Sequence, residues 1–251
     1  MKEIRSLQHP LVKHLAKLQH NRDYRYEHHR LVIEGEKMIA EVCQQLSPVT
    51  LFAVDPALIP SQLTCKETYI VTPEILDKIA GAQNPEGIIA EIPMPPLKPL
   101  KKCSSLLVLD HVSDPGNVGA LLRSAVAFGW EGVFFLTGSC DPFNDKALRA
   151  AKGATFRLPL AWGSWEELDQ LIAFNRLTPL AADLHGKLLS ELAPVKAPLL
   201  IVGNEANGIS IEASKRSQAV TIPMSGKMES LNVSVAGGIM MYALGNARRQ
   251  K

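Results

Sequence analysis

The strongest constraint on the fold lies between residues 103 and 251, where short apolar runs alternate with longer amphipathic stretches. The runs at 106–109 and 199–202 are apolar without interruption, which is typical of parallel strands buried on both faces. Alternating strands and helices predict an α/β fold with a mainly parallel sheet. We expect five or six strands, within the segments 104–111, 132–138, 157–162, 178–184, 197–205 and 219–224.

The stretches between these strands place apolar residues at helical spacing. We expect helices within the segments 117–129, 144–154, 164–175 and 230–249. Asn117 is of a residue type that caps helices, and it stands where the first of them should begin. The last helix is predicted to have one apolar face, made of Ala236, Ile239, Met240, Ala243 and Leu244.

A break in this pattern at 91–105 contains four prolines and three lysines, as expected of a stiff, extended linker. Before it, the helical spacing of Leu11, Leu15 and Leu18 and several short apolar runs predict a second, smaller α/β domain. We therefore divide the chain into a domain at 1–92, a linker at 93–102 and a domain at 103–251.

The composition excludes several classes of protein. Apolar residues make up 46% of the chain and charged residues 21%, which indicates a folded protein and not a disordered one. The four cysteines lie far apart, so neither a zinc site nor a disulfide framework is expected, and we predict no metal. The polar N-terminus predicts neither a signal peptide nor a membrane span, so the expected location is the cytoplasm.

Positive charge gathers at one end of the chain. The net charge is only +2, but residues 1–30 hold seven Lys or Arg against three acidic residues. Such a stretch indicates contact with a polyanion, and a solvated helix face is the alternative.

Polar loops follow three of the strands expected in the second domain, at the sheet edge where parallel α/β folds bind ligands. The first loop, at 110–119, has Asn117 near its end and leads to Arg123 six residues later. Its glycines would let a phosphate or a ligand come close to the backbone. A capped surface helix with an exposed arginine explains the same residues.

The other two loops also combine glycine with small polar residues. The second, at 203–208, contains Glu205 between residues that favour turns with positive φ. The third, at 222–234, runs from a strand through Gly226 to a helix start near Ser230 and Asn232, where free N–H groups suit a polar ligand. Turn stabilisation and ordinary helix capping remain the alternatives for these two loops.

Taken together, the three loops resemble the three motifs of the SpoU (TrmH) branch of the SPOUT methyltransferases. The matching segments are DPGNVGALLRSAVAFG, IVGNEANGIS and TIPMSGKMESLNVSVAGGIMMYAL, and the resemblance covers about 103–251. It implies a parallel sheet with a deep trefoil knot, S-adenosylmethionine as the cofactor, RNA as the substrate and a homodimer. The apolar face of the last helix is a candidate for part of the dimer interface.

The resemblance also assigns the cofactor site residue by residue. The backbone at Gly203, Ile222 and Leu231 matches the family's positions around the adenosine, with Thr137 and Gly138 as secondary candidates.

Arg123 matches the family's essential arginine, for which a role as general base has been argued. Because a guanidinium has a pKa above about 12, we expect it instead to clamp a neighbouring phosphate and stabilise negative charge developing on the ribose oxygen. Asn117 and Asn232 would orient the ribose and Arg123, with Ser230 as a helper. Glu205 would hold Asn117 or Arg123, or accept the proton through water.

Residues 1–92 resemble, more loosely, the L30e-like substrate-binding domain that some members of this family carry. This likeness fits the basic N-terminus, and it makes Lys13, Arg22, Arg25 and Arg30 the candidate RNA-binding residues.

The resulting prediction is methyl transfer to a ribose 2′-hydroxyl of RNA, with 23S-type ribosomal RNA preferred over tRNA by analogy. Methylation of a base and a non-catalytic RNA-binding or ribosome-assembly protein are the alternatives. A dinucleotide-dependent oxidoreductase is disfavoured, because DPGNVG does not supply the GxGxxG glycines.

Overall fold

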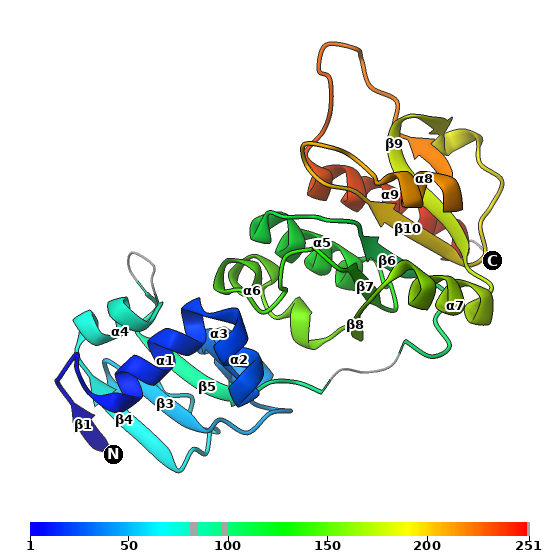
Figure 1. The fold of residues 1–251 in the computed structure, drawn as a ribbon. Coiled ribbons are helices and arrows are strands. Elements are labelled where there is room, and N and C mark those ends of the chain that lie inside the picture. Colours follow the sequence, from blue (N-terminus) through cyan, green and yellow to red (C-terminus); the bar gives the residue numbers. More distant parts are fainter. Residues whose placement is uncertain (81–84, 97–99, 250–251) are drawn as a thin grey trace. The chain divides into compact units, whose positions relative to one another are not determined.

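The computed structural model describes residues 1–80, 85–96 and 100–249 (Figure 1). The chain divides into two compact units, the first formed by Met1–Pro96 with Phe143–Phe156, the second by Leu97–Pro142 and Arg157–Lys251. The predicted division differs at the segment 143–156, which packs with the first unit although the sequence pattern assigns it to the second. The proline-rich break also begins later than expected, because β5 continues to Pro93. Residues 97–99 of the predicted linker lie outside the described residues.

The first unit has a mixed sheet of five strands in the order β1-β4-β3-β5-β2. Its apolar core joins α1 and α4 to the sheet through buried side chains such as Leu15, Ile75 and Phe52. The predicted face of the first helix is therefore confirmed, whereas β1, α2 and α4 were not expected. The bounds are β1 (Lys2–Ile4), α1 (Pro10–His20), α2 (Arg22–His28), β2 (Arg30–Glu34), α3 (Glu36–Val42), β3 (Thr50–Ala53), β4 (Glu67–Val71), α4 (Pro73–Ala80), β5 (Ile88–Pro93) and α6 (Asp145–Ala151).

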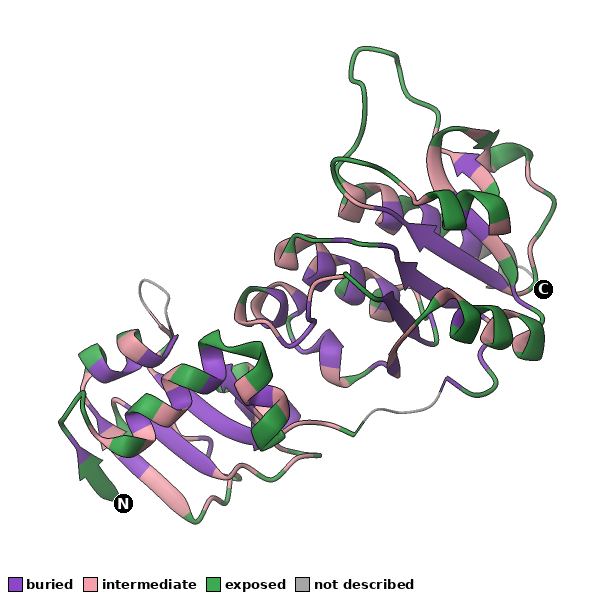
Figure 2. Ribbon diagram, viewed as in Figure 1, coloured by how far each residue is buried: buried purple, intermediate pink, exposed green. Residues whose placement is uncertain are grey.

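The second unit confirms the predicted parallel α/β fold. Its sheet has six strands in the order β11-β9-β10-β6-β7-β8, and every neighbouring pair is parallel. Helices cover the sheet on both faces, and the central strands are buried throughout (Figure 2). The bounds are β6 (Leu106–Leu109), α5 (Pro115–Ala127), β7 (Val133–Leu136), β8 (Leu160–Gly163), α7 (Trp165–Asn175), β9 (Thr178–Leu188), β10 (Pro198–Val202), α8 (Ile211–Arg216), β11 (Gln218–Thr221) and α9 (Val233–Arg249). Helix α8 was not expected.

Two predictions about the helices of this unit were wrong. Helix α5 is capped by Asp114 and not by Asn117, because the Asp114 carboxylate accepts a hydrogen bond from the Asn117 backbone N–H at 2.8 Å. The side chain of Asn117 is thereby left available for other contacts. Helix α9 has no single apolar face: Met240 and Leu244 are buried, whereas Ile239 is 42% exposed.

The two glycines in α9 have different surroundings. A Cβ built on Gly237 would lie 2.5 Å from Leu121 Cδ2, so the absence of a side chain lets α9 pack closely against α5. A Cβ on Gly238 would meet only Ser124, at 3.5 Å. Gly237 is therefore explained by packing, which the sequence pattern alone did not indicate.

None of the helices that the structure describes has the length and apolar character that a membrane crossing requires.

Candidate functional site

The site lies where the order of the strands reverses in the sheet of the second unit. Strands β6 and β10 are neighbours, with Val202 paired to Leu109. After β6 the chain first adds β7 and β8 on one side of it, and then β9, β10 and β11 on the other side. Because both strands are parallel, the loops that follow them leave the same edge of the sheet. This reversal is where open parallel sheets bind ligands.

The Glu205 carboxylate joins these two loops. One oxygen accepts hydrogen bonds from the Ser113 hydroxyl at 2.9 Å and the Ser113 N–H at 3.2 Å. The other accepts from the Asp114 N–H at 3.1 Å and from Asn117 Nδ2 at 3.0 Å. The carboxylate thus fixes the entry to α5 and turns the Asn117 side chain toward the second loop.

The same hydrogen bonds determine the charge state of Glu205. Partial burial acts to raise its pKa, but donation from the Asn117 side chain and from backbone N–H groups outweighs burial and lowers the pKa to about 2. A carboxylate this acidic is a poor proton acceptor at neutral pH. Of the roles predicted for Glu205, the geometry supports holding Asn117.

The third loop joins the network through Asn117. Asn232 Nδ2 donates to Asn117 Oδ1 at 2.9 Å. On its other side, Asn232 Oδ1 accepts from the N–H groups of Ser234 and Val235, at 2.9 and 3.3 Å, at the beginning of α9. Hydrogen bonds therefore run from Glu205 through Asn117 to Asn232, and they connect all three predicted loops.

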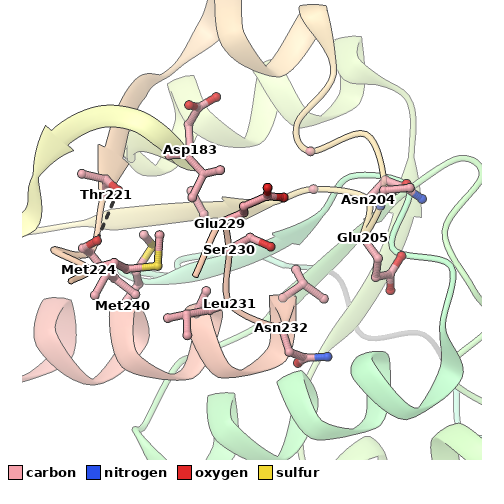
Figure 3. Close-up of a pocket in the computed structure, with 18 residues that line it drawn as sticks. Asp183, Asn204, Glu205, Thr221, Met224, Glu229, Ser230, Leu231, Asn232 and Met240 are labelled. Atoms are coloured by element: carbon pink, nitrogen blue, oxygen red, sulfur yellow. Dashed lines mark hydrogen bonds between the residues drawn. The ribbon is translucent and has the colours of Figure 1, made fainter. Parts of the chain in front are cut away.

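A cavity of about 450 Å³ opens beside this network (Figure 3). It is lined by three of the five predicted cofactor positions, Gly203, Ile222 and Leu231, and by Glu205, Ser230 and Asn232 from the predicted catalytic set. Sequence reasoning missed Asp183, Met224, Glu229 and Met240, which also line it. Asp183 directly follows the apolar start of β9, and a carboxylate at such a position is a signal that could have identified it.

The remaining predicted residues lie elsewhere in the second unit. Thr137 and Gly138 follow β7 and are not among the residues that line the cavity, so nothing in the geometry supports a cofactor role for them. Arg123 lies on the exposed side of α5. Among the described residues, its guanidinium has no hydrogen-bonding or ionic partner within the chain, so it is free to bind a ligand.

Comparison with known proteins bears on both parts of the chain. Residues 104–242 match the SpoU rRNA Methylase family, and these residues include all three joined loops and the cavity. This chain belongs to the SpoU rRNA methylase family. It is therefore an RNA methyltransferase by family. Residues 9–90 match the MRM3-like substrate binding domain.

Relatives of this SpoU protein extend over its whole length. The 23S rRNA (guanosine(2553)-2′-O)-methyltransferase RlmP of Bacillus subtilis is 32% identical over 248 residues, covering 97% of this chain and 99% of the relative. The solved structure of an AdoMet-bound rRNA methyltransferase from Sinorhizobium meliloti has a TM-score of 0.84 at 26% identity. The match covers 99% of this chain and 98% of the solved chain. A solved structure of an RNA 2′-O ribose methyltransferase has a TM-score of 0.85 at 28% identity. The match covers 99% of this chain and 100% of the solved chain.

In the first unit, the predicted RNA-binding residues separate into different environments. Lys13 on α1 and Arg22 on α2 are exposed. Arg25 is only 3% exposed, and its Nη1 donates to the carbonyl oxygens of Leu18 and Gln19 at 3.1 and 3.0 Å. Arg25 therefore stabilises the junction of α1 and α2, and nothing in its geometry supports the predicted RNA contact. Arg30 is half-buried, with its Nε 3.7 Å from a carboxylate oxygen of Glu91.

Replacing Glu205 with Gln should change how the stability of the SpoU domain depends on pH. Because the pKa of Glu205 is lowered from 4.5 to about 2, its contribution to stability is complete above pH 4.5 and is lost as the pH falls toward 2. Urea unfolding measures this dependence between about pH 5 and about pH 2, the range that spans the two pKa values. Over this range the free energy of unfolding should fall less for Glu205→Gln than for the wild type.

Glu191→Gln serves as the matched control, because Glu191 is an exposed carboxylate of the same unit that lies outside the cavity. If Glu205→Gln and Glu191→Gln had the same pH dependence, the network would not hold Glu205 ionised.

Proposed function

We propose that this enzyme transfers the methyl group of S-adenosylmethionine to a ribose 2′-hydroxyl of ribosomal RNA. The observation that carries the proposal is the cavity lined by the second and third loops, which hydrogen bonds of Glu205 and Asn232 join to Asn117 of the first loop. Relatives that span the whole chain are named for ribose methylation of RNA, and one of them for methylation of 23S rRNA.

The cavity fits the cofactor in size and in chemistry. Its volume of about 450 Å³ lies within the range of small-molecule sites. Leu231 and Met240 supply apolar surface for a flat base, while the backbone at Gly203, Ile222 and Leu231 offers polar groups around it. When bound, S-adenosylmethionine supplies a methyl group that is already activated on a sulfonium. The protein has mainly to position the ribose oxygen and to handle its proton.

Arg123 would act on the RNA and not on the cofactor. Arg123 carries a positive charge and lies exposed on α5, six residues after the hydrogen-bonded Asn117. A bidentate clamp on the phosphate next to the target ribose would hold the hydroxyl in place. The same positive charge would stabilise negative charge that develops on the oxygen. Asn117 and Asn232 would keep the beginnings of α5 and α9 in register for this step, with Ser230 beside the cavity.

The outward side of α9 supports the predicted homodimer. Val235, Ile239 and Tyr242 are 49%, 42% and 55% exposed, and their spacing of four and three residues places them on one stripe of the helix. The ring of Phe128 extends this stripe, with its centroid 5.5 Å from that of Tyr242. A second copy of the chain would bury this surface. The cytoplasmic location remains a prediction.

The direct test is methyl transfer from labelled S-adenosylmethionine to ribosomal RNA and to tRNA from a strain that lacks the protein, followed by nucleoside analysis. We expect a 2′-O-methylnucleoside from the ribosomal RNA alone. Arg123→Ala should lower kcat by on the order of 100-fold, the usual effect of losing one charge-stabilising donor, while calorimetry shows unchanged cofactor binding.

Lys215→Ala is the control, since Lys215 is an exposed cation of the same unit that lies outside the cavity. Label on a base would contradict the ribose assignment, and full turnover by Arg123→Ala would remove the clamp. Cofactor binding without label in any fraction would favour an assembly protein over an enzyme.

Lys13 and Arg22 should contribute to RNA affinity through phosphate contacts. For the Lys13→Ala/Arg22→Ala variant we expect weaker binding to ribosomal RNA and a salt slope reduced by about 1 for each lost contact. Filter binding across a range of salt concentrations measures both effects. Lys66→Ala removes an exposed cation of the same unit outside α1 and α2 and should leave the slope unchanged. An unaltered slope in the double variant would show that these side chains are only solvated.

Replacing Ile239 with Asp should disrupt the dimer, because it places a charge in the middle of the exposed stripe on α9. Sedimentation velocity is expected to show a dimer for the wild type and a monomer for Ile239→Asp, with circular dichroism unchanged. Phe174→Asp, at an apolar residue of α7 that is 67% exposed, should remain dimeric. A wild-type monomer, or a dimer that withstands Ile239→Asp, would exclude this interface.

A further inference from the structure

His111 is held in an unusual conformation at the end of β6. Its φ of 59° lies in the left-handed region, which is uncommon and strained for residues other than glycine. Two hydrogen bonds hold its backbone: its N–H donates to Ser139 Oγ at 3.1 Å, and its carbonyl oxygen accepts from Asn204 Nδ2 at 2.9 Å. Strain that the surroundings maintain in this way is concentrated at functional sites.

The ring of His111 is oriented by a buried carboxylate. Its Nδ1 lies 2.7 Å from Asp110 Oδ1, while Asp110 Oδ2 accepts the Ser210 N–H at 2.7 Å. The Asp110 side chain is fully buried, and the His111 side chain is 52% exposed. Because a carboxylate accepts hydrogen bonds, the pair places the proton on Nδ1. In the neutral ring, Nε2 is then left as an acceptor.

The neighbouring loop is shaped around this ring. A Cβ on Gly138 would lie 2.6 Å from His111 Cδ2 and 3.1 Å from its Nε2. Any side chain at this position would therefore displace the His111 ring. Gly138 and Thr137 are themselves exposed and lie outside the cavity lining. The end of β7 thus packs against His111. The cavity itself is lined by the middle of β9 and by residues at the ends of β10 and β11, farther along the same sheet.

We propose that His111, oriented by Asp110, binds the RNA substrate and helps to select it. Its Nε2 would accept a hydrogen bond from a donor close to the target ribose, either a 2′-hydroxyl or a base N–H. The connection to the reaction site is short, because Asn204 both lines the cavity and holds the His111 carbonyl. His111 is separated by one residue from Ser113, which donates to Glu205. The inference rests on the proposed function, since it supposes an RNA substrate at this edge.

The test uses the full-length protein with an unmodified 23S rRNA transcript as the probe. His111→Gly removes the ring, and glycine adopts the positive φ of this position freely. Urea unfolding checks that the variant is folded. We expect the KM and the Kd for the transcript to rise roughly 3- to 10-fold, the usual effect of losing one hydrogen bond, while kcat and cofactor affinity stay within about twofold.

Asp110→Asn tests the tautomer of His111 and not merely the presence of its ring. An amide NH2 facing Nδ1 favours the opposite tautomer, in which Nε2 carries the proton, so the ring would present a donor where the RNA needs an acceptor. Its KM for the transcript should therefore rise as in His111→Gly. His185→Ala, at an exposed histidine of β9 outside the cavity lining, is the control expected to match the wild type.

The outcomes separate the two proposals. If the wild type methylates the transcript and His111→Gly has unchanged KM and Kd, the inference about His111 fails and the proposed function stands. If the wild type binds the transcript without methylating it, the proposed function fails, and the Kd of His111→Gly still decides the inference. If the wild type neither binds nor methylates the transcript, both are overturned.

Discussion

The geometry of the site depends on one carboxylate. Glu205 lies in the loop after β10. It accepts hydrogen bonds from backbone and side-chain groups of the loop after β6. Without Glu205 these donors would face solvent at an exposed helix start. With Glu205 ionised they are fixed. Asn117 then faces Asn232, and the third loop is held at the beginning of α9. Binding and chemistry in our proposal both use this arrangement.

The sheet makes such an arrangement possible. Asn117 and Glu205 are 88 residues apart in the sequence, and Asn117 and Asn232 are 115 apart. They meet because β6 and β10 are parallel neighbours whose loops leave the same edge. The flanking strands extend this edge in both directions, so β9 and β11 border the cavity while β7 supports His111. In our proposal, one edge therefore holds a small cofactor and, next to it, a large polymer.

The sequence predicted those features that depend on local pattern. Strands buried on both faces appear as uninterrupted apolar runs, so the parallel sheet could be recognised, and motif resemblance placed Gly203, Ile222 and Leu231 at the cavity. Features that depend on tertiary contact could not be recognised. Arg25 has the charge of an RNA contact, and only the fold shows that backbone carbonyls bind its guanidinium.

The same limit explains the remaining errors of sequence reasoning. Either Asp114 or Asn117 could cap α5 by residue type, and the choice depends on the distant Glu205, which holds the Asn117 side chain. Helical spacing identified apolar residues in α9, but it could not separate Met240, which is buried, from Ile239, which is exposed.

The pairing of β6 with β10 also has a consequence for how the chain is made. The two strands pair at residues about 90 apart, so at a synthesis rate of roughly 5–20 residues per second β10 follows β6 from the ribosome by several seconds. During that interval β6, which is apolar along its whole length, has an open edge with no partner on that side. Nascent chains of this protein are thus exposed to aggregation in a way that the finished molecule is not.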